Sequence, residues 1–103
     1  MSFRQALDED RRLVILQCLG QADGFALNEN LLEKMVQRLR LGIIGRDLLR
    51  AHLNWLDQHG LVTIEHLPVG NGTDLWAATL TRAGHEVAKG REHPGVARPE
   101  PAG

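Results

Sequence analysis

The sequence has little cysteine, no long apolar run and no strong net charge. Its single cysteine, Cys18, has no partner for an internal disulfide, and this favours a cytoplasmic location. No stretch approaches the run of about 18 apolar residues that a membrane helix needs, so we expect no membrane partner. The N-terminal segment is polar and acidic, which is not typical of a signal or transit peptide. A net charge of −1 does not indicate the strongly basic surface that many nucleic-acid-binding domains carry.

The charged residues are unevenly distributed along the 103-residue chain, whose length suits one domain. The segment from Lys34 to Arg50 holds five basic residues and one acid, Asp47, and so carries a local charge of +4. The segment from Ala51 to Thr81 holds three acids and neither lysine nor arginine, which gives −3. The sequence therefore predicts one cationic segment followed by an anionic one.

The first half of the chain has the patterns of two helices. Apolar residues at helical spacing predict a first helix over residues 5–19. Residues 25–27 are predicted to form a very short strand. A second helix then begins after an N-cap at Asn28 or Asn30 and runs to about residue 39.

A glycine-containing turn and a third helix follow. Two glycines within residues 41–45 permit the sharp change of direction that a helix-turn-helix needs. The third helix is predicted over residues 45–59, because leucines recur at i, i+4 and i+7. These leucines, which should face the core, are Leu49, Leu53 and Leu56.

The second half of the chain has the pattern of a hairpin. Residues 61–67 and 75–81 are rich in β-forming residues, and the pair Asn71-Gly72 between them is a strong hairpin signal. Thr81 is predicted to cap a short helix that ends near residue 89. From Gly90 onward, three prolines and three glycines predict an extended or flexible tail. We therefore expect an α+β domain over residues 1–90 and a tail over residues 91–103.

One long segment carries a family resemblance. The sequence LRLGIIGRDLLRAHLNWLDQHGLV, followed by a hairpin and then LTRAGHEV, resembles the winged helix-turn-helix superfamily of bacterial and phage DNA-binding regulators. The resemblance covers about residues 8–89. It implies a three-helix core, a two-stranded β-hairpin wing and a short C-terminal helix. The chain length and the segment GVARP also resemble small winged-helix proteins of Mu-like prophages.

The resemblance implies a function and a set of residues. In the superfamily the third helix enters the major groove with its N-terminal residues at the base edges. Carried over, Arg46 or Arg50 would pair with guanine. The resemblance therefore predicts a transcriptional regulator that binds double-stranded DNA, with a homodimer as a possible assembly. The expected DNA-binding residues are Lys34, Arg38, Arg40, Arg46 and Arg50.

The sequence also departs from the superfamily pattern, which leaves a second hypothesis open. No serine or threonine stands at the start of the third helix, where one often contacts phosphate, and residues 70–74 offer no arginine or lysine in the wing. A neutral-to-acidic wing suits a protein–protein interaction or assembly module that does not bind DNA.

The sequence does not predict catalysis or ligand binding. Its five histidines lack the Cys-x-x-Cys or His-x-x-x-His spacing of a metal site. No nucleophile stands beside a base, and Gly70-x-Gly72 lies in a hairpin, not before a helix as a phosphate loop does. We therefore expect no enzyme activity, catalytic residue, metal, cofactor or small-molecule ligand. Trp55 and Trp76 are expected to be core residues.

Overall fold

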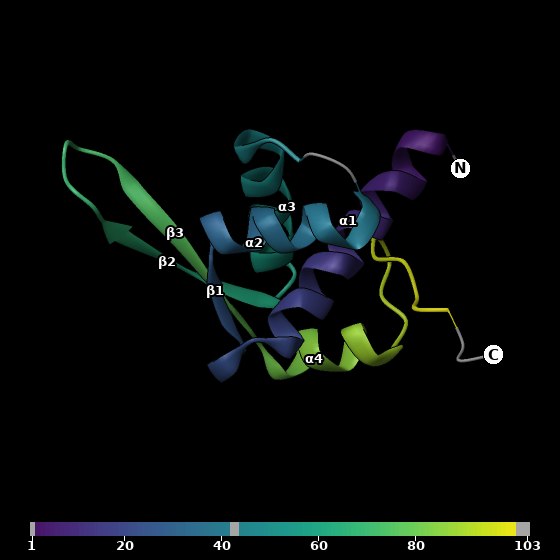
Figure 1. Cartoon of the computed structure of the whole chain (residues 1–103). Coiled ribbons are helices and arrows are strands. Elements are labelled where there is room, and N and C mark those ends of the chain that lie inside the picture. Colours follow the sequence, from purple (N-terminus) through teal and green to yellow (C-terminus); the bar gives the residue numbers. More distant parts are fainter. Residues whose placement is uncertain (1, 42–43, 101–103) are drawn as a thin grey trace.

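A computed structural model describes residues 2–41 and 44–100, and the side chains of residues 40 and 41 lie outside the described part. Within it, four α-helices pack with a three-stranded antiparallel sheet (Figure 1). The expected α+β class is therefore confirmed. None of the helices in this part has the length and apolar composition that a membrane span requires.

The N-terminal helix α1 (Phe3–Gln21) begins two residues earlier and ends two residues later than expected. A reciprocal cap explains the early start. The Ser2 hydroxyl accepts a hydrogen bond from the Gln5 N–H at 3.1 Å, and the Gln5 side chain accepts one from the Ser2 N–H at 2.9 Å. The inner face of α1 buries apolar residues that form the centre of the core, namely Leu13, Ile15, Leu16, Cys18 and Leu19.

The next elements are a 3₁₀ turn, η1 (Asp23–Phe25), the short strand β1 (Ala26–Asn28) and helix α2 (Glu29–Val36). Of the two expected caps, Asn28 is the one used, since its side-chain oxygen accepts from the Leu31 N–H at 3.0 Å. A π-helical turn, η2 (Gln37–Leu41), extends α2. The expected turn over residues 41–45 lies partly outside the described residues.

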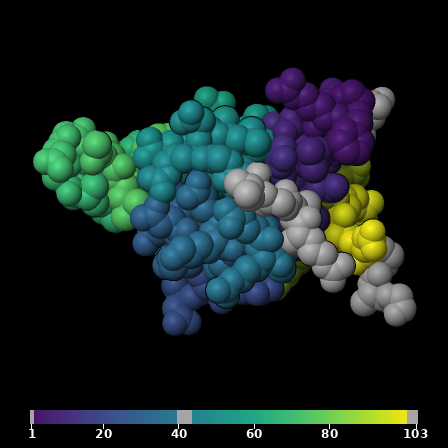
Figure 2. Space-filling model, turned by 45° about the horizontal axis from the view of Figure 1, so that its top comes forward, coloured from purple at the N-terminus to yellow at the C-terminus, as the bar shows by residue number. Residues whose placement is uncertain are grey.

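Helix α3 (Arg46–Gln58) follows, and it buries the predicted leucine stripe together with His52. The strands β2 (Val62–Pro68) and β3 (Asp74–Leu80) then form the predicted hairpin. Three consecutive residues with positive φ, from Gly70 to Gly72, make its tight turn. The strand order is β1-β3-β2, with Leu27 opposite Ala78 and Val62 opposite Leu80. The end of the hairpin stands clear of the helices (Figures 1 and 2).

Helix α4 (Arg82–Lys89) packs against α1, and the Thr81 hydroxyl caps it by accepting from the Gly84 N–H at 3.0 Å. Residues 91–100 form neither helix nor strand, and a tight turn pairs His93 with Val96, but this segment is not separate from the domain. It crosses α1, where Val96 is only 5% exposed and the Ala97 N–H donates to the Glu9 carbonyl at 3.1 Å. The C-terminal segment (yellow) therefore lies beside the N-terminal helix (purple) in Figure 2.

Candidate functional site

A buried carboxylate joins the start of α2 to α3 and to the hairpin. The Glu29 side chain is 0% exposed. Its two oxygens accept hydrogen bonds from Nε and Nη2 of Arg50 at 2.7 and 2.8 Å. One of them also accepts from the backbone N–H of Trp76, on β3, at 2.7 Å. Glu29 therefore fixes the position of the hairpin relative to the two helices.

The environment keeps this carboxylate charged. Burial raises the pKa of the Glu29 carboxyl, because a low-dielectric interior disfavours an ion. The hydrogen bonds from Arg50 and Trp76 and the charges of Arg50 and Arg46 outweigh burial, so the pKa lies below its ordinary value of 4.5. Glu29 and Arg50 therefore form a charged pair in which both hydrogen bonds are charge-assisted.

Arg50 was expected to contact bases, but the structure gives it internal partners. Besides Glu29, its Nη2 donates to the Asp74 carbonyl at 3.2 Å. Its guanidinium carbon lies 4.6 Å from the centroid of the Trp76 ring, in a cation–π contact. The side chain is 30% exposed. Arg50 therefore holds the hairpin against α3, a role that the sequence did not predict.

Arg46 lies one turn earlier on α3 and is held more loosely. Its side chain is 40% exposed. Nε lies 3.6 Å from Oε1 of Glu29, Nη2 lies 3.5 Å from Oε2 of Glu33, and Nη2 also donates to the Asn30 side chain. Both ion-pair distances exceed those of Arg50. We call this group the arginine–glutamate cluster; its members are Glu29, Glu33, Arg46 and Arg50.

Lys34 and Arg38 lie on the outer surface of α2 and η2. Both are exposed, and no ion pair in the described part of the chain involves either of them. Lys34 follows Asn30 by one helical turn, so Arg46, which is bonded to Asn30, lies near the same side of α2. The side chain of Arg40 lies outside the described residues. Of the five predicted cations, two are exposed, and two belong to the cluster.

The outer face of α3 has a different character from that of α2. Its exposed residues are Asp47, Leu48, Ala51, Asn54, Asp57 and Gln58. None of these is cationic, and the hairpin beyond them has no lysine or arginine either. An open groove of about 660 Å³ lies between the start of α3 and the hairpin, with Arg46 on one side and Thr73 on the other. The exposed members of the predicted cation set, Lys34 and Arg38, therefore lie on α2 and η2 and not on the exposed face of α3.

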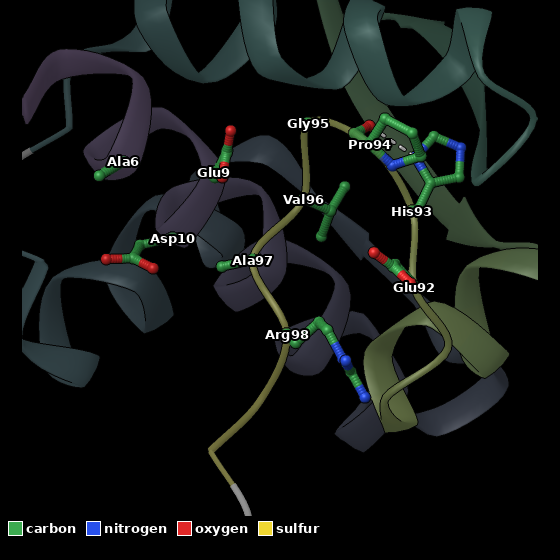
Figure 3. Close-up of a pocket in the computed structure, with 10 residues that line it drawn as sticks. All are labelled: Ala6, Glu9, Asp10, Glu92, His93, Pro94, Gly95, Val96, Ala97 and Arg98. Carbon is green, nitrogen blue, oxygen red and sulfur yellow. Dashed lines mark hydrogen bonds between the residues drawn. The ribbon is translucent and has the colours of Figure 1, made fainter. Parts of the chain in front are cut away.

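A second hollow, of about 950 Å³, lies where the C-terminal segment crosses α1 (Figure 3). Glu9 from α1 and His93, Gly95 and Val96 from that segment line part of it. The segment is held there because Nη1 of Arg12 donates to the Gly95 carbonyl at 2.9 Å. No sequence pattern predicted this contact, since it joins residues 83 positions apart.

The two tryptophans share one feature, an arginine against the ring. Each is partly buried against the core and carries an arginine on its ring, with Arg12 lying 4.1 Å from the Trp55 centroid as Arg50 lies over Trp76. His59 also stacks on the Trp55 ring, at a centroid distance of 3.8 Å. Among the described residues, no three metal-ligating side chains come together.

Two relatives define the family of this small α+β protein. The chain is 38% identical over 96 residues to "Uncharacterized protein gp26" of Escherichia phage Mu, an alignment that covers 92% of this chain and 93% of the phage protein. It is 39% identical over 87 residues to an "Uncharacterized protein" of Haemophilus influenzae, an alignment that covers 81% of this chain and 83% of that protein. The chain therefore belongs to the family that includes these two proteins. No family model matches it, and no solved structure does.

Proposed function

We propose that this domain is a winged helix, with α2 and α3 as the helix-turn-helix and the β2–β3 hairpin as the wing. The order of elements supports the proposal. A short strand precedes α2, a hairpin follows α3, and β1 adds to the hairpin through β3. In this assignment α3 is the recognition helix.

We propose further that the domain binds double-stranded DNA as a regulator, in which case its phage Mu relative suggests a phage or prophage role. The supporting observation is a set of three cations: Lys34 and Arg38 are exposed on α2 and η2, and the partly exposed Arg46 of α3 bonds Asn30, one helical turn before Lys34. Lys34 and Arg38 contact phosphates, with Arg40 as a further predicted contact. Arg46 reaches the major groove of the DNA. Arg50 positions the wing and does not contact bases.

The number of available cations sets the expected strength of binding. Each neutralised phosphate contributes a slope of roughly −0.9 to the dependence of log affinity on log salt. Lys34, Arg38 and Arg46 therefore support salt-sensitive binding with little sequence preference in a monomer. A homodimer that places two recognition helices about 34 Å apart would supply specificity.

The test is fluorescence anisotropy of a labelled duplex over a range of salt concentrations. Wild-type protein should bind at low salt, and Lys34→Gln with Arg38→Gln should make the salt slope shallower by about 2. The control pair, Arg82→Gln with Lys89→Gln on α4, makes the same charge change on exposed residues and should leave the slope nearly unchanged. Wild-type protein that does not bind duplex at low salt would refute the proposal.

One observation favours a second candidate, a protein-interaction module. The outer face of α3 presents Asp47, Ala51 and Asp57, so phosphates would meet two carboxylates there. A heparin column run beside a sizing column separates the two functions. Strong self-association without heparin retention supports the interaction module, whereas a monomer that elutes late from heparin supports DNA binding.

A further inference from the structure

Glu33 and a DNA phosphate would use the same side chain, Arg46. We infer that Glu33 sets the DNA affinity of this domain, because its carboxylate holds Arg46 in the free protein and must give it up when DNA binds. Glu33, on α2, thus regulates how strongly Arg46 of the recognition helix α3 binds DNA. The inference rests on the DNA-binding function proposed above.

The two arginines of the cluster differ in how readily they can change partners. Arg50 makes two parallel hydrogen bonds, at 2.7 and 2.8 Å, to a carboxylate that is fully buried. A phosphate cannot replace that partner without leaving Glu29 charged and alone in the interior. Arg50 therefore keeps its position when DNA approaches.

Arg46 is placed for exchange. Its Nη2 lies 3.5 Å from the Glu33 carboxylate, and the two side chains are 40% and 22% exposed; an ion pair that is this long and partly exposed holds its partners weakly. The other partners of Arg46 are the neutral Asn30 side chain and Glu29, whose Oε1 lies 3.6 Å from Nε. A phosphate can accept two parallel hydrogen bonds from a guanidinium, and such a pair is stronger than the single 3.5 Å contact between Arg46 and Glu33. Arg46 also borders the groove between α3 and the hairpin. If the Arg46 side chain turned away from Glu33, towards this protein groove, its guanidinium would be free to meet a bound duplex.

Loss of the Glu33 charge should therefore raise DNA affinity more than loss of a carboxylate that does not touch Arg46. Asp47 provides the comparison, since it is exposed in the first turn of α3 and forms no ion pair in the described residues. Glu33→Gln and Asp47→Asn each remove one negative charge from the same region without changing side-chain size. Asp47 lies on the outer face of α3, so general repulsion of DNA is relieved at least as strongly in Asp47→Asn, whereas release of Arg46 acts only in Glu33→Gln.

The experiment measures duplex affinity by anisotropy for wild type, Glu33→Gln and Asp47→Asn, each with Arg46 present or changed to Ala. We expect Glu33→Gln to raise affinity about fivefold and Asp47→Asn about twofold. In the Arg46→Ala background the two gains should become equal, and thermal melts should show that every variant is folded. Equal gains with Arg46 present, or an unchanged Glu33→Gln gain without it, would overturn the inference and leave DNA binding intact. Absence of duplex binding in all variants would overturn both.

Discussion

Arg50 on α3 meets Glu29 on α2 through two parallel hydrogen bonds of 2.7 and 2.8 Å. The same carboxylate accepts the backbone N–H of Trp76, so one buried charge organises two helices and a strand. Because three of these hydrogen bonds end on Glu29, removing it leaves the Trp76 N–H without an acceptor and the Arg50 guanidinium without its main one. The consequences for stability and for binding can be measured separately.

Glu29→Ala should lower the free energy of unfolding by about 3 kcal/mol, because it leaves the Trp76 N–H without an acceptor and removes the main partner of the Arg50 guanidinium. Glu33→Ala is the matched control. It removes the same kind of side chain from the same helix, but its ion pair with Arg46 is partly exposed, and the cost should stay below about 1 kcal/mol. Urea denaturation measures both values. Equal losses would contradict the structural role of Glu29.

Arg46→Ala and Arg50→Ala should have opposite signatures. Arg46→Ala should weaken duplex binding and leave the melting temperature nearly unchanged, because its ion pairs are long and partly exposed. Arg50→Ala should lower the melting temperature by several degrees, because it leaves the Glu29 carboxylate buried without its main partner. Thermal melts combined with anisotropy distinguish the two. Identical melting temperatures would show that Arg50 does not anchor the hairpin.

The free energy of unfolding should decrease as the pH is lowered from about 6.5 to about 4, and His52 is the reason. The Nδ1 atom of His52 accepts from Nε of Arg12 at 3.3 Å, and burial, with the Arg12 charge, lowers the pKa of His52 from 6.5 to about 4. The folded protein therefore keeps His52 neutral over a range in which the unfolded chain takes up a proton. This contribution is fully present above pH 6.5 and decreases as the pH falls towards 4, by about 3 kcal/mol at most.

Urea denaturation of wild type and His52→Gln at pH 7, 6 and 5 would measure this contribution (pH values chosen at roughly unit steps below neutrality). Glu29 does not interfere, because its pKa is lowered and its contribution is lost only below about 4.5. The difference between wild type and His52→Gln should shrink as the pH falls. A difference that is constant over this range would refute the assignment to His52.

Gly95→Ala should displace the C-terminal segment. Gly95 has φ of +87°, and an added Cβ would overlap a ring carbon of Trp55. Gly72→Ala is the control, since Gly72 has a similar φ of +70° but has open space around it. The control should cost about 1 kcal/mol from backbone conformation alone, and Gly95→Ala about 3 kcal/mol.

Hydrogen exchange gives a local measure of the same change. The Ala97 N–H, which donates to the Glu9 carbonyl, should lose protection in Gly95→Ala and keep it in Gly72→Ala. Retained protection in Gly95→Ala would mean that the segment accommodates the methyl group without leaving α1.

Local sequence determined the secondary structure of this protein. The cap at Thr81, the leucine stripe of α3 and the Asn71-Gly72 turn were predicted and are present, and Asn28 is one of the two caps expected for α2. Each depends on residues within about one or two turns of one another, so spacing and residue type suffice to predict it. The packed C-terminal segment was missed, because a Pro/Gly-rich composition says nothing about an arginine 83 residues away that binds its backbone.

Tertiary structure alone decided what the arginines of α3 do. Helical periodicity placed Arg46 and Arg50 together on the polar side, where both looked equally available for DNA. Arg50 instead pairs with Glu29, 21 residues earlier, and Glu29 in turn binds Trp76, 47 residues later. Local spacing fixes the direction of a side chain from its helix, but a buried ion pair forms only where distant elements pack and exclude water.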